Sequence, residues 1–194
     1  MADRVLPSFR ASVLPSTAAP QHRSTETRLA ISNGRLGMIL LIGTETILFS
    51  CFIGAYLVLR MGATIWPPIG SPALSLGLSS VNTSVLVLST ILVFRRQIRA
   101  TFALGSLFLL LQAVEFHRLY ARGLTLQTGA YGALFYSLIS CHGLHVLGGL
   151  AILGMVLWRM GSDPSLSEWI GHAQLYWHFV TGVWLVLFTI LYLV

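Results

Sequence analysis

Four ionisable side chains stand inside apolar runs of this 194-residue sequence, and they are its strongest candidates for chemistry. They are one glutamate, Glu45, and three histidines, His142, His145 and His178. His142 and His145 are three residues apart, so they share a face if the segment is a helix. Ionisable groups inside a bilayer are tolerated where they face protein, water or a lipid head group. We therefore expect these four side chains to have polar partners within the membrane.

Glu45 is predicted to lie in the middle of a membrane-spanning helix, ~15 Å from its inner end at a rise of ~1.5 Å per residue. An unpaired carboxylate at that depth costs about 2.5–3.5 kcal/mol on insertion scales. The side chain should therefore be protonated, hydrogen-bonded or paired, either as a structural acid or as a proton-active or lipid-facing carboxyl. His178 falls at a similar depth, ~13 Å, which makes it a candidate partner for Glu45.

The histidines are also candidate ligands for haem, for which imidazole is a common axial ligand. A haem held by two histidines requires both at one depth on facing helices, and only His145 and His178 meet that condition. The bulky side chains of Tyr176 and Trp177 crowd that position. Hydrogen bonding between helices is the favoured role, with proton handling or lipid contact as alternatives. We expect no catalytic residue, metal or cofactor in this chain.

Glu115 lies near the outer end of another apolar run, just before Arg118 and Arg122. A carboxyl group in that position is predicted to reach the membrane surface or to form a salt bridge there. Contact with a partner subunit is the alternative. Tyr176 and Trp177, at the head of the last run, are assigned to the interface together with Glu115.

The composition predicts an all-α membrane protein. Hydrophobic residues make up 55% of the chain and charged residues only 9%, whereas about a quarter of a soluble domain is charged. A helix needs roughly 20 apolar residues to cross a bilayer. Five segments are long enough, which predicts a five-transmembrane-helix bundle over residues of about 36–59, 74–94, 101–120, 130–158 and 169–194.

Arginine positions predict the orientation of this bundle. The chain has twelve arginines and no lysine, and nine of the arginines fall on one side of the predicted membrane segments against three on the other. Positive residues favour the cytoplasm, so we expect a cytoplasmic N-terminus and an outside C-terminus. Because the arginines lie in the N-terminal segment and in short loops, they do not indicate nucleic-acid binding. Residues 1–33 are predicted to be a poorly ordered cytoplasmic tail, and residues 34–194 the spanning domain.

Glycines and prolines add two expectations. Proline is absent from all five runs, which counts against a transporter built from broken helices. Small residues inside spanning helices allow close helix approach, and we expect this at Gly37, Gly43, Gly54, Gly143, Gly148, Gly149 and Gly154.

Several short motifs occur in the order typical of one family. They are Leu36-Gly37-Met38 with Thr44-Glu45 and Ala55-Tyr56, Pro72 with Val81-Asn82-Thr83, Gly105 with Gln112 and Glu115, His142-Gly143-Leu144-His145-Val146, and Tyr176-Trp177-His178-Phe179-Val180 with Val183-Trp184-Leu185. Over about residues 36–194 the chain resembles subunit III of the haem–copper oxygen reductases, the superfamily of cytochrome c and quinol oxidases.

The resemblance implies an accessory, non-redox subunit of a bacterial aerobic terminal oxidase, which transfers electrons to O₂ and pumps protons. Its expected partners are membrane lipids, a catalytic subunit I with haems and copper, and a copper-binding subunit II in the bacterial cytoplasmic (inner) membrane. Glu45 matches a family glutamate associated with a lipid-filled cleft and with support of proton uptake. Bound phospholipid and stability during turnover are implied as well.

The chain departs from the family pattern in three places. The long family form has seven helices, and five are predicted here. An acid usual after the Tyr-Trp-His-Phe-Val run is replaced by Thr181, and the phenylalanine usual before His142 is replaced by Cys141. An accessory protein of nitric oxide reductase is therefore a first alternative. A haem-bearing membrane anchor is a second alternative.

Overall fold

A computed structural model of the chain describes residues 33–72, 74–161 and 165–193. These residues form five helices and a short π-helical end, with no strand among them: α1 (Asn33–Gly62), α2 (Leu76–Phe94), α3 (Ile98–Ala121), α4 (Ala130–Arg159), α5 (Leu166–Phe188) and η1 (Thr189–Leu193). All five helices are long and apolar enough to cross a membrane. The predicted all-α, five-helix architecture is thus confirmed. Residues 1–32 of the predicted tail lie outside the described residues.

Helices α1, α3 and α5 begin three residues before the apolar runs that predicted them, whereas α2 begins two residues after the start of its run. The third begins at Ile98 instead of residue 101, and the fifth begins at Leu166 instead of residue 169. An apolar run marks the hydrocarbon layer, whereas helical hydrogen bonding continues into the polar layer beyond it. The turn between α2 and α3 is correspondingly short, with Arg96 in the left-handed region at φ 58°.

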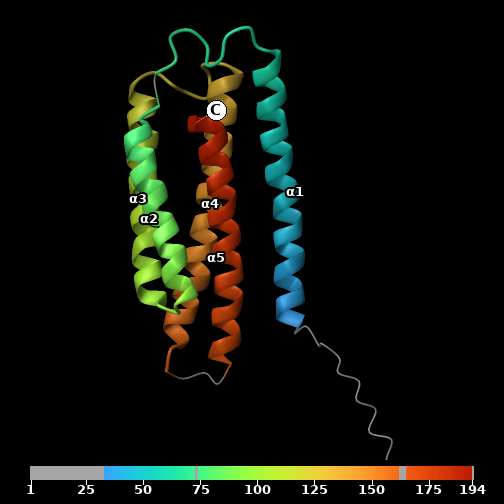
Figure 1. Cartoon of the computed structure of the whole chain (residues 1–194), viewed down its shortest axis with the longest axis vertical. Helices are drawn as coiled ribbons and strands as arrows, with labels where there is room; N and C mark the ends of the chain where they lie inside the picture. Colours follow the sequence, from blue (N-terminus) through green and yellow to red (C-terminus); the bar gives the residue numbers. More distant parts are fainter. Residues whose placement is uncertain (1–32, 73, 162–164, 194) are drawn as a thin grey trace, which may run out of the picture. The chain divides into compact units, whose positions relative to one another are not determined.

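Helices α2, α3, α4 and α5 form the main packed unit, and α1 runs beside α4 and α5 (Figure 1). Only Phe49 and Tyr56 of α1 are buried, whereas α4 and α5 bury residues along their whole length. Backbone hydrogen bonds are satisfied within each helix, as a bilayer demands, so side-chain contacts decide how the helices pack. In this chain α1 is the least enclosed helix and leaves most of its surface for lipid or other protein.

Trp177 of α5 fills the space between three other helices. Its indole N–H donates to Ser89 Oγ of α2 at 3.0 Å. A Cβ placed on Gly105 of α3 would lie 2.5 Å from the Trp177 ring, and one placed on Gly149 of α4 would lie 2.9 Å from it. The two glycines therefore create the room that the fully buried indole occupies.

Glycine positions were predicted only partly. Gly149 makes the expected close approach, and a Cβ on Gly148 would lie 3.3 Å from the Tyr176 hydroxyl. For four other glycines the prediction of a close approach is wrong within this chain. An added Cβ would meet no atom within 4 Å at Gly37, Gly43, Gly54 or Gly143. Gly37 and Gly43 are exposed, and Gly54 and Gly143 are partly exposed, so the small size of these glycines does not serve packing between helices of this chain.

Candidate functional site

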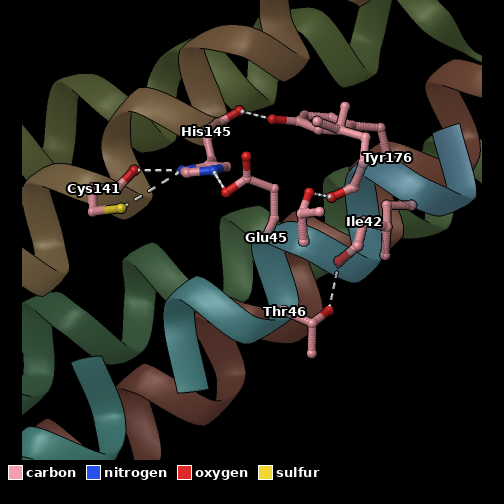
Figure 2. A network of polar contacts seen from close by, with 8 residues as sticks. Ile42, Glu45, Thr46, Cys141, His145 and Tyr176 are labelled. Carbon is pink, nitrogen blue, oxygen red and sulfur yellow. Dashed lines mark hydrogen bonds and ion pairs between the residues drawn. The ribbon is translucent and has the colours of Figure 1, made fainter. Parts of the chain in front are cut away.

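Glu45 of α1 and His145 of α4 form an ion-pair contact between these two helices. Glu45 Oε2 lies 2.8 Å from His145 Nε2, and the two side chains are 24% and 14% exposed. Figure 2 shows both side chains pointing toward each other across the helix interface. The ring of Phe49, one helical turn after Glu45, packs edge-on against His145 with ring centroids 4.9 Å apart. The pair thus lies at the side of the bundle, half-enclosed by apolar groups.

The hydrogen bonds of His145 fix the number of protons in this pair. His145 Nδ1 lies 2.7 Å from the carbonyl oxygen of Cys141, and a carbonyl oxygen only accepts. Nδ1 must therefore carry a hydrogen, which leaves Nε2 facing Glu45. That contact holds one proton, either as a carboxylic acid donating to a neutral ring or as an imidazolium donating to a carboxylate. The pair is neutral in both states, so neither state leaves a net charge in the apolar layer.

Two further contacts hold the backbone and ring of His145. The Tyr176 hydroxyl of α5 donates to the His145 carbonyl oxygen at 3.3 Å. Cys141 Sγ lies 4.0 Å from His145 Nδ1, on the same side as the carbonyl contact. Three helices, α1, α4 and α5, therefore contribute to one polar network around His145 (Figure 2).

The predicted contact between Glu45 and His178 is wrong. His178 is exposed, and its Nδ1 bonds to the Gln174 carbonyl oxygen of its own helix at 2.6 Å. The predicted depth did not cause this error. The direction in which a side chain points also depends on its rotation about the helix axis, which changes by about 100° from one residue to the next. The face of α5 beside α1 carries Phe179 and Val183, and His178 points away from it.

His142 does not share the role of His145, although both lie on α4. It is 1% exposed, and its ring stacks on Trp184 with centroids 5.0 Å apart and contacts the edge of Phe108. Neither ring nitrogen has a hydrogen-bond partner in the described part of the chain. His142 is thus a desolvated ring enclosed by aromatic side chains.

The geometry does not support a haem held by His145 and His178. His145 is occupied by Glu45 and Cys141, and His178 faces outward. Among residues 33–72, 74–161 and 165–193, no group of three or more His, Cys, Asp or Glu residues is arranged to hold a metal ion.

The predicted interface residues lie inside the bundle. Tyr176 is 6% exposed, Trp177 is fully buried and Glu115 is 1% exposed. Glu115 does not reach toward the surface arginines, because the hydroxyl of Ser79 lies 2.6 Å from its Oε1 inside the α2–α3 contact. The assignment of all three to an interface is therefore wrong for this chain. The sequence did contain a signal for this contact. Two apolar helices each carry a pair of polar residues three positions apart, and these pairs are Ser79 and Asn82 in α2 and Gln112 and Glu115 in α3.

An apolar groove lies between α1 and α5, about one turn along α1 from the Glu45–His145 pair. Its volume is about 360 Å³. Thr46 and Ser50 supply the few polar atoms, and both hydroxyls already donate to carbonyls of α1. The groove is lined by Thr46, Phe49, Ser50, Ile53, Phe179, Gly182, Val183 and Val186. Its shape and lining suit a hydrocarbon chain better than a polar ligand.

Position 181 holds a hydrogen-bonded hydroxyl. Thr181 of α5 is 4% exposed, and its Oγ1 lies 2.7 Å from Oγ1 of Thr90 in α2. The two hydroxyls share one hydrogen bond, so the position joins two helices without any charge.

Comparisons with known proteins agree on one family. The family model for cytochrome c oxidase subunit III matches residues 14–194. A cytochrome c oxidase subunit 3 from Synechocystis sp. is 34% identical over 92% of this chain and 81% of its own length. The corresponding protein of Alkalihalophilus pseudofirmus is 33% identical over 92% and 94%. A cytochrome bo(3) ubiquinol oxidase subunit 3 from Pseudomonas putida is 30% identical over 81% and 86%.

Proposed function

The chain belongs to the cytochrome c oxidase subunit III family, and from this premise we propose how its buried groups serve the oxidase. It is an accessory subunit of an aerobic terminal oxidase. In this proposal it carries no redox centre and stabilises the catalytic subunit while that subunit turns over. The observation that carries the proposal is the Glu45–His145 contact, a neutral intramembrane pair that holds one proton.

The pair is suited to supporting proton uptake. A proton shared between a carboxyl and an imidazole can shift from one to the other without a change in net charge, so the apolar surroundings do not oppose the shift. Glu45 and His145 remain partly exposed at the side of the bundle. A neighbouring subunit or a lipid head group can therefore reach them, which a fully buried pair would prevent.

The groove between α1 and α5 is the proposed phospholipid site. A hydrocarbon chain in this groove would contact both helices and add apolar contacts to α1, whose own packing against α4 and α5 is limited. The lipid would thus help to keep Glu45 beside His145. Binding of lipid and the integrity of the proton pair are linked in this proposal.

The proposed partners are the catalytic subunit I, which holds the haems and copper, and the copper-binding subunit II. We place the complex in the bacterial cytoplasmic (inner) membrane, with the N-terminus of this chain in the cytoplasm and its C-terminus outside. The distribution of arginines, nine against three, supports that orientation.

The sequence left two alternatives open, an accessory protein of nitric oxide reductase and a haem-bearing membrane anchor, and neither is favoured. The relatives compared above are named as subunits of cytochrome c or ubiquinol oxidases, which does not support the nitric oxide reductase reading. A haem-bearing anchor would need two histidines free to ligate, whereas His145 is engaged and His178 points away from it.

Replacing Glu45 tests the proposal. We expect Glu45→Ala to leave the initial rate of O₂ consumption nearly unchanged and to shorten the working lifetime of the purified complex several-fold. Glu45→Gln keeps a hydrogen bond to His145 but has no exchangeable acid proton, so it should shorten the lifetime as well. The measurement is O₂ consumption followed to inactivation under continuous turnover.

Thr44→Val is the matched control, because Thr44 lies beside Glu45, its hydroxyl bonds only to the Leu41 carbonyl oxygen, and it does not line the groove. It should keep the wild-type lifetime. A wild-type lifetime for Glu45→Gln would show that only the hydrogen bond matters and not the proton. Immediate loss of all activity would place Glu45 on the main proton path and contradict an accessory role.

A further inference from the structure

A second polar cluster lies between α2 and α3, apart from the Glu45–His145 pair. Ser79 Oγ lies 2.6 Å from Glu115 Oε1, and Asn82 Nδ2 donates to Gln112 Oε1 at 3.0 Å. The two contacts are one helical turn apart on both helices. Ser79 and Asn82 are fully buried, and Glu115 is 1% exposed.

Three oxygen atoms of this cluster are buried without a hydrogen-bond partner in the described part of the chain: Asn82 Oδ1, Glu115 Oε2 and the Tyr192 hydroxyl. Tyr192, on η1, lies close enough to interact with the side chains of Ser79 and Gln112 and with Glu115. All three oxygens thus surround the same two interhelical bonds. Leaving a buried polar atom unpaired is destabilising, so three together call for a common partner.

The bonds of Ser79 indicate the charge state of Glu115. Ser79 Oγ has one hydrogen but lies near two acceptors, Glu115 Oε1 and the Ser75 carbonyl oxygen at 3.1 Å. If Glu115 carries a proton on Oε1 it can donate to Ser79 Oγ, and Ser79 can then donate to Ser75. Both contacts are satisfied only in that arrangement. The Ser75 hydroxyl lies 3.2 Å from the same Oε1 and can donate to it in either charge state. Among the ion pairs of the described residues none includes Glu115, so a carboxylate there would have hydroxyl partners but no positive charge beside it.

We propose that Asn82, Glu115 and Tyr192 form a binding site for one water molecule, with Glu115 as a neutral carboxylic acid. The water donates to Asn82 Oδ1 and Glu115 Oε2 and accepts from the Tyr192 hydroxyl. Three hydrogen bonds are typical of an internal water, and this arrangement pairs each of the three oxygens. The water joins α2, α3 and η1.

A cavity adjoins the cluster at Tyr192. Tyr192 also lines a cavity of about 260 Å³, together with Tyr56, Arg60, Trp66 and Tyr131. The loop residues Pro67 and Pro72 contribute to the same cavity. Tyr192 therefore lines the cavity and also lies beside the cluster.

Infrared difference spectroscopy of the purified oxidase complex tests the site. Glu115→Gln is nearly isosteric and should remove one C=O stretching band of a protonated carboxylic acid. Exchange of H₂¹⁶O for H₂¹⁸O should reveal the O–H stretch of a bound water in the wild type. Tyr192→Phe removes the hydroxyl that donates to this water, so that band should shift or be lost.

The control is Thr90→Val, which removes a different, partly buried hydroxyl of α2, one bonded to Thr181. It should leave both bands unchanged. The proposal is overturned if Glu115→Gln removes no acid band, or if the water band survives Tyr192→Phe unaltered. A bound cation beside a Glu115 carboxylate would also overturn the proposal. In that case, replacing Na⁺ and K⁺ by tetramethylammonium would lower the melting temperature of the wild type but not of Glu115→Gln.

Discussion

A single proton between Glu45 and His145 explains why two ionisable residues can lie opposite each other in an apolar layer. The carbonyl oxygen of Cys141 holds one hydrogen of the imidazole, so the other nitrogen is left to share a proton with the carboxyl group. The chemistry depends on a backbone acceptor as much as on the two side chains. Substitutions that leave this acceptor in place should therefore test the side chains cleanly.

We expect energetic coupling between Glu45 and His145. In a double-mutant cycle of Glu45→Gln and His145→Gln, the coupling in the free energy of unfolding should be about 0.5–2 kcal/mol, the range for contacting polar pairs. Unfolding in mixed detergent micelles, followed by circular dichroism, measures it.

The matching cycle pairs Glu45→Gln with His178→Gln. His178 lies on α5 and bonds only to the backbone of its own helix turn, so this cycle should show coupling near zero. Equal coupling in the two cycles would disprove the direct Glu45–His145 interaction.

At the scale of the helix, Trp177 determines how α2, α3, α4 and α5 fit together. Its ring requires glycine at two positions on neighbouring helices, and its N–H requires the Ser89 hydroxyl. A rigid, fully buried ring cannot move aside easily, because the bundle is closely packed around it.

Gly105→Ala should destabilise the bundle. The added Cβ would lie 2.5 Å from the Trp177 ring, so the ring or a helix must shift, at a cost of about 1–3 kcal/mol in the free energy of unfolding. Gly43→Ala is the control, because its Cβ would meet no atom within 4 Å and alanine favours the helix by up to about 1 kcal/mol. Equal unfolding curves for the two variants would contradict the packing of Trp177 against Gly105.

The helices were predictable from the sequence, whereas their contact faces were only partly so. The lengths of the apolar segments predicted all five helices, because the thickness of a bilayer sets the length of a helix that crosses it. Depth alone could not choose between His145 and His178 as the partner of Glu45, since rotation about the helix axis depends on the neighbouring helices. For Glu115 the nearby arginines suggested the surface, but hydroxyls on α2 provide partners inside the bundle.

For the whole molecule, the structure is that of a bundle with polar networks and no arrangement for metal binding among its described residues. Family membership places it in a terminal oxidase, and the limited packing of α1 leaves a groove beside a proton-holding pair. In our proposal this subunit contributes to the durability of the complex more than to each catalytic cycle. Its effect should therefore grow with the number of turnovers.

The most direct test is the time course of O₂ consumption by the oxidase purified with this chain, without it, and after adding it back. We expect equal initial rates, inactivation several-fold sooner without the chain, and recovery of the longer lifetime when the chain is returned. Lifetimes that do not depend on the chain, or an initial rate near zero in its absence, would contradict its role as an accessory subunit that preserves activity.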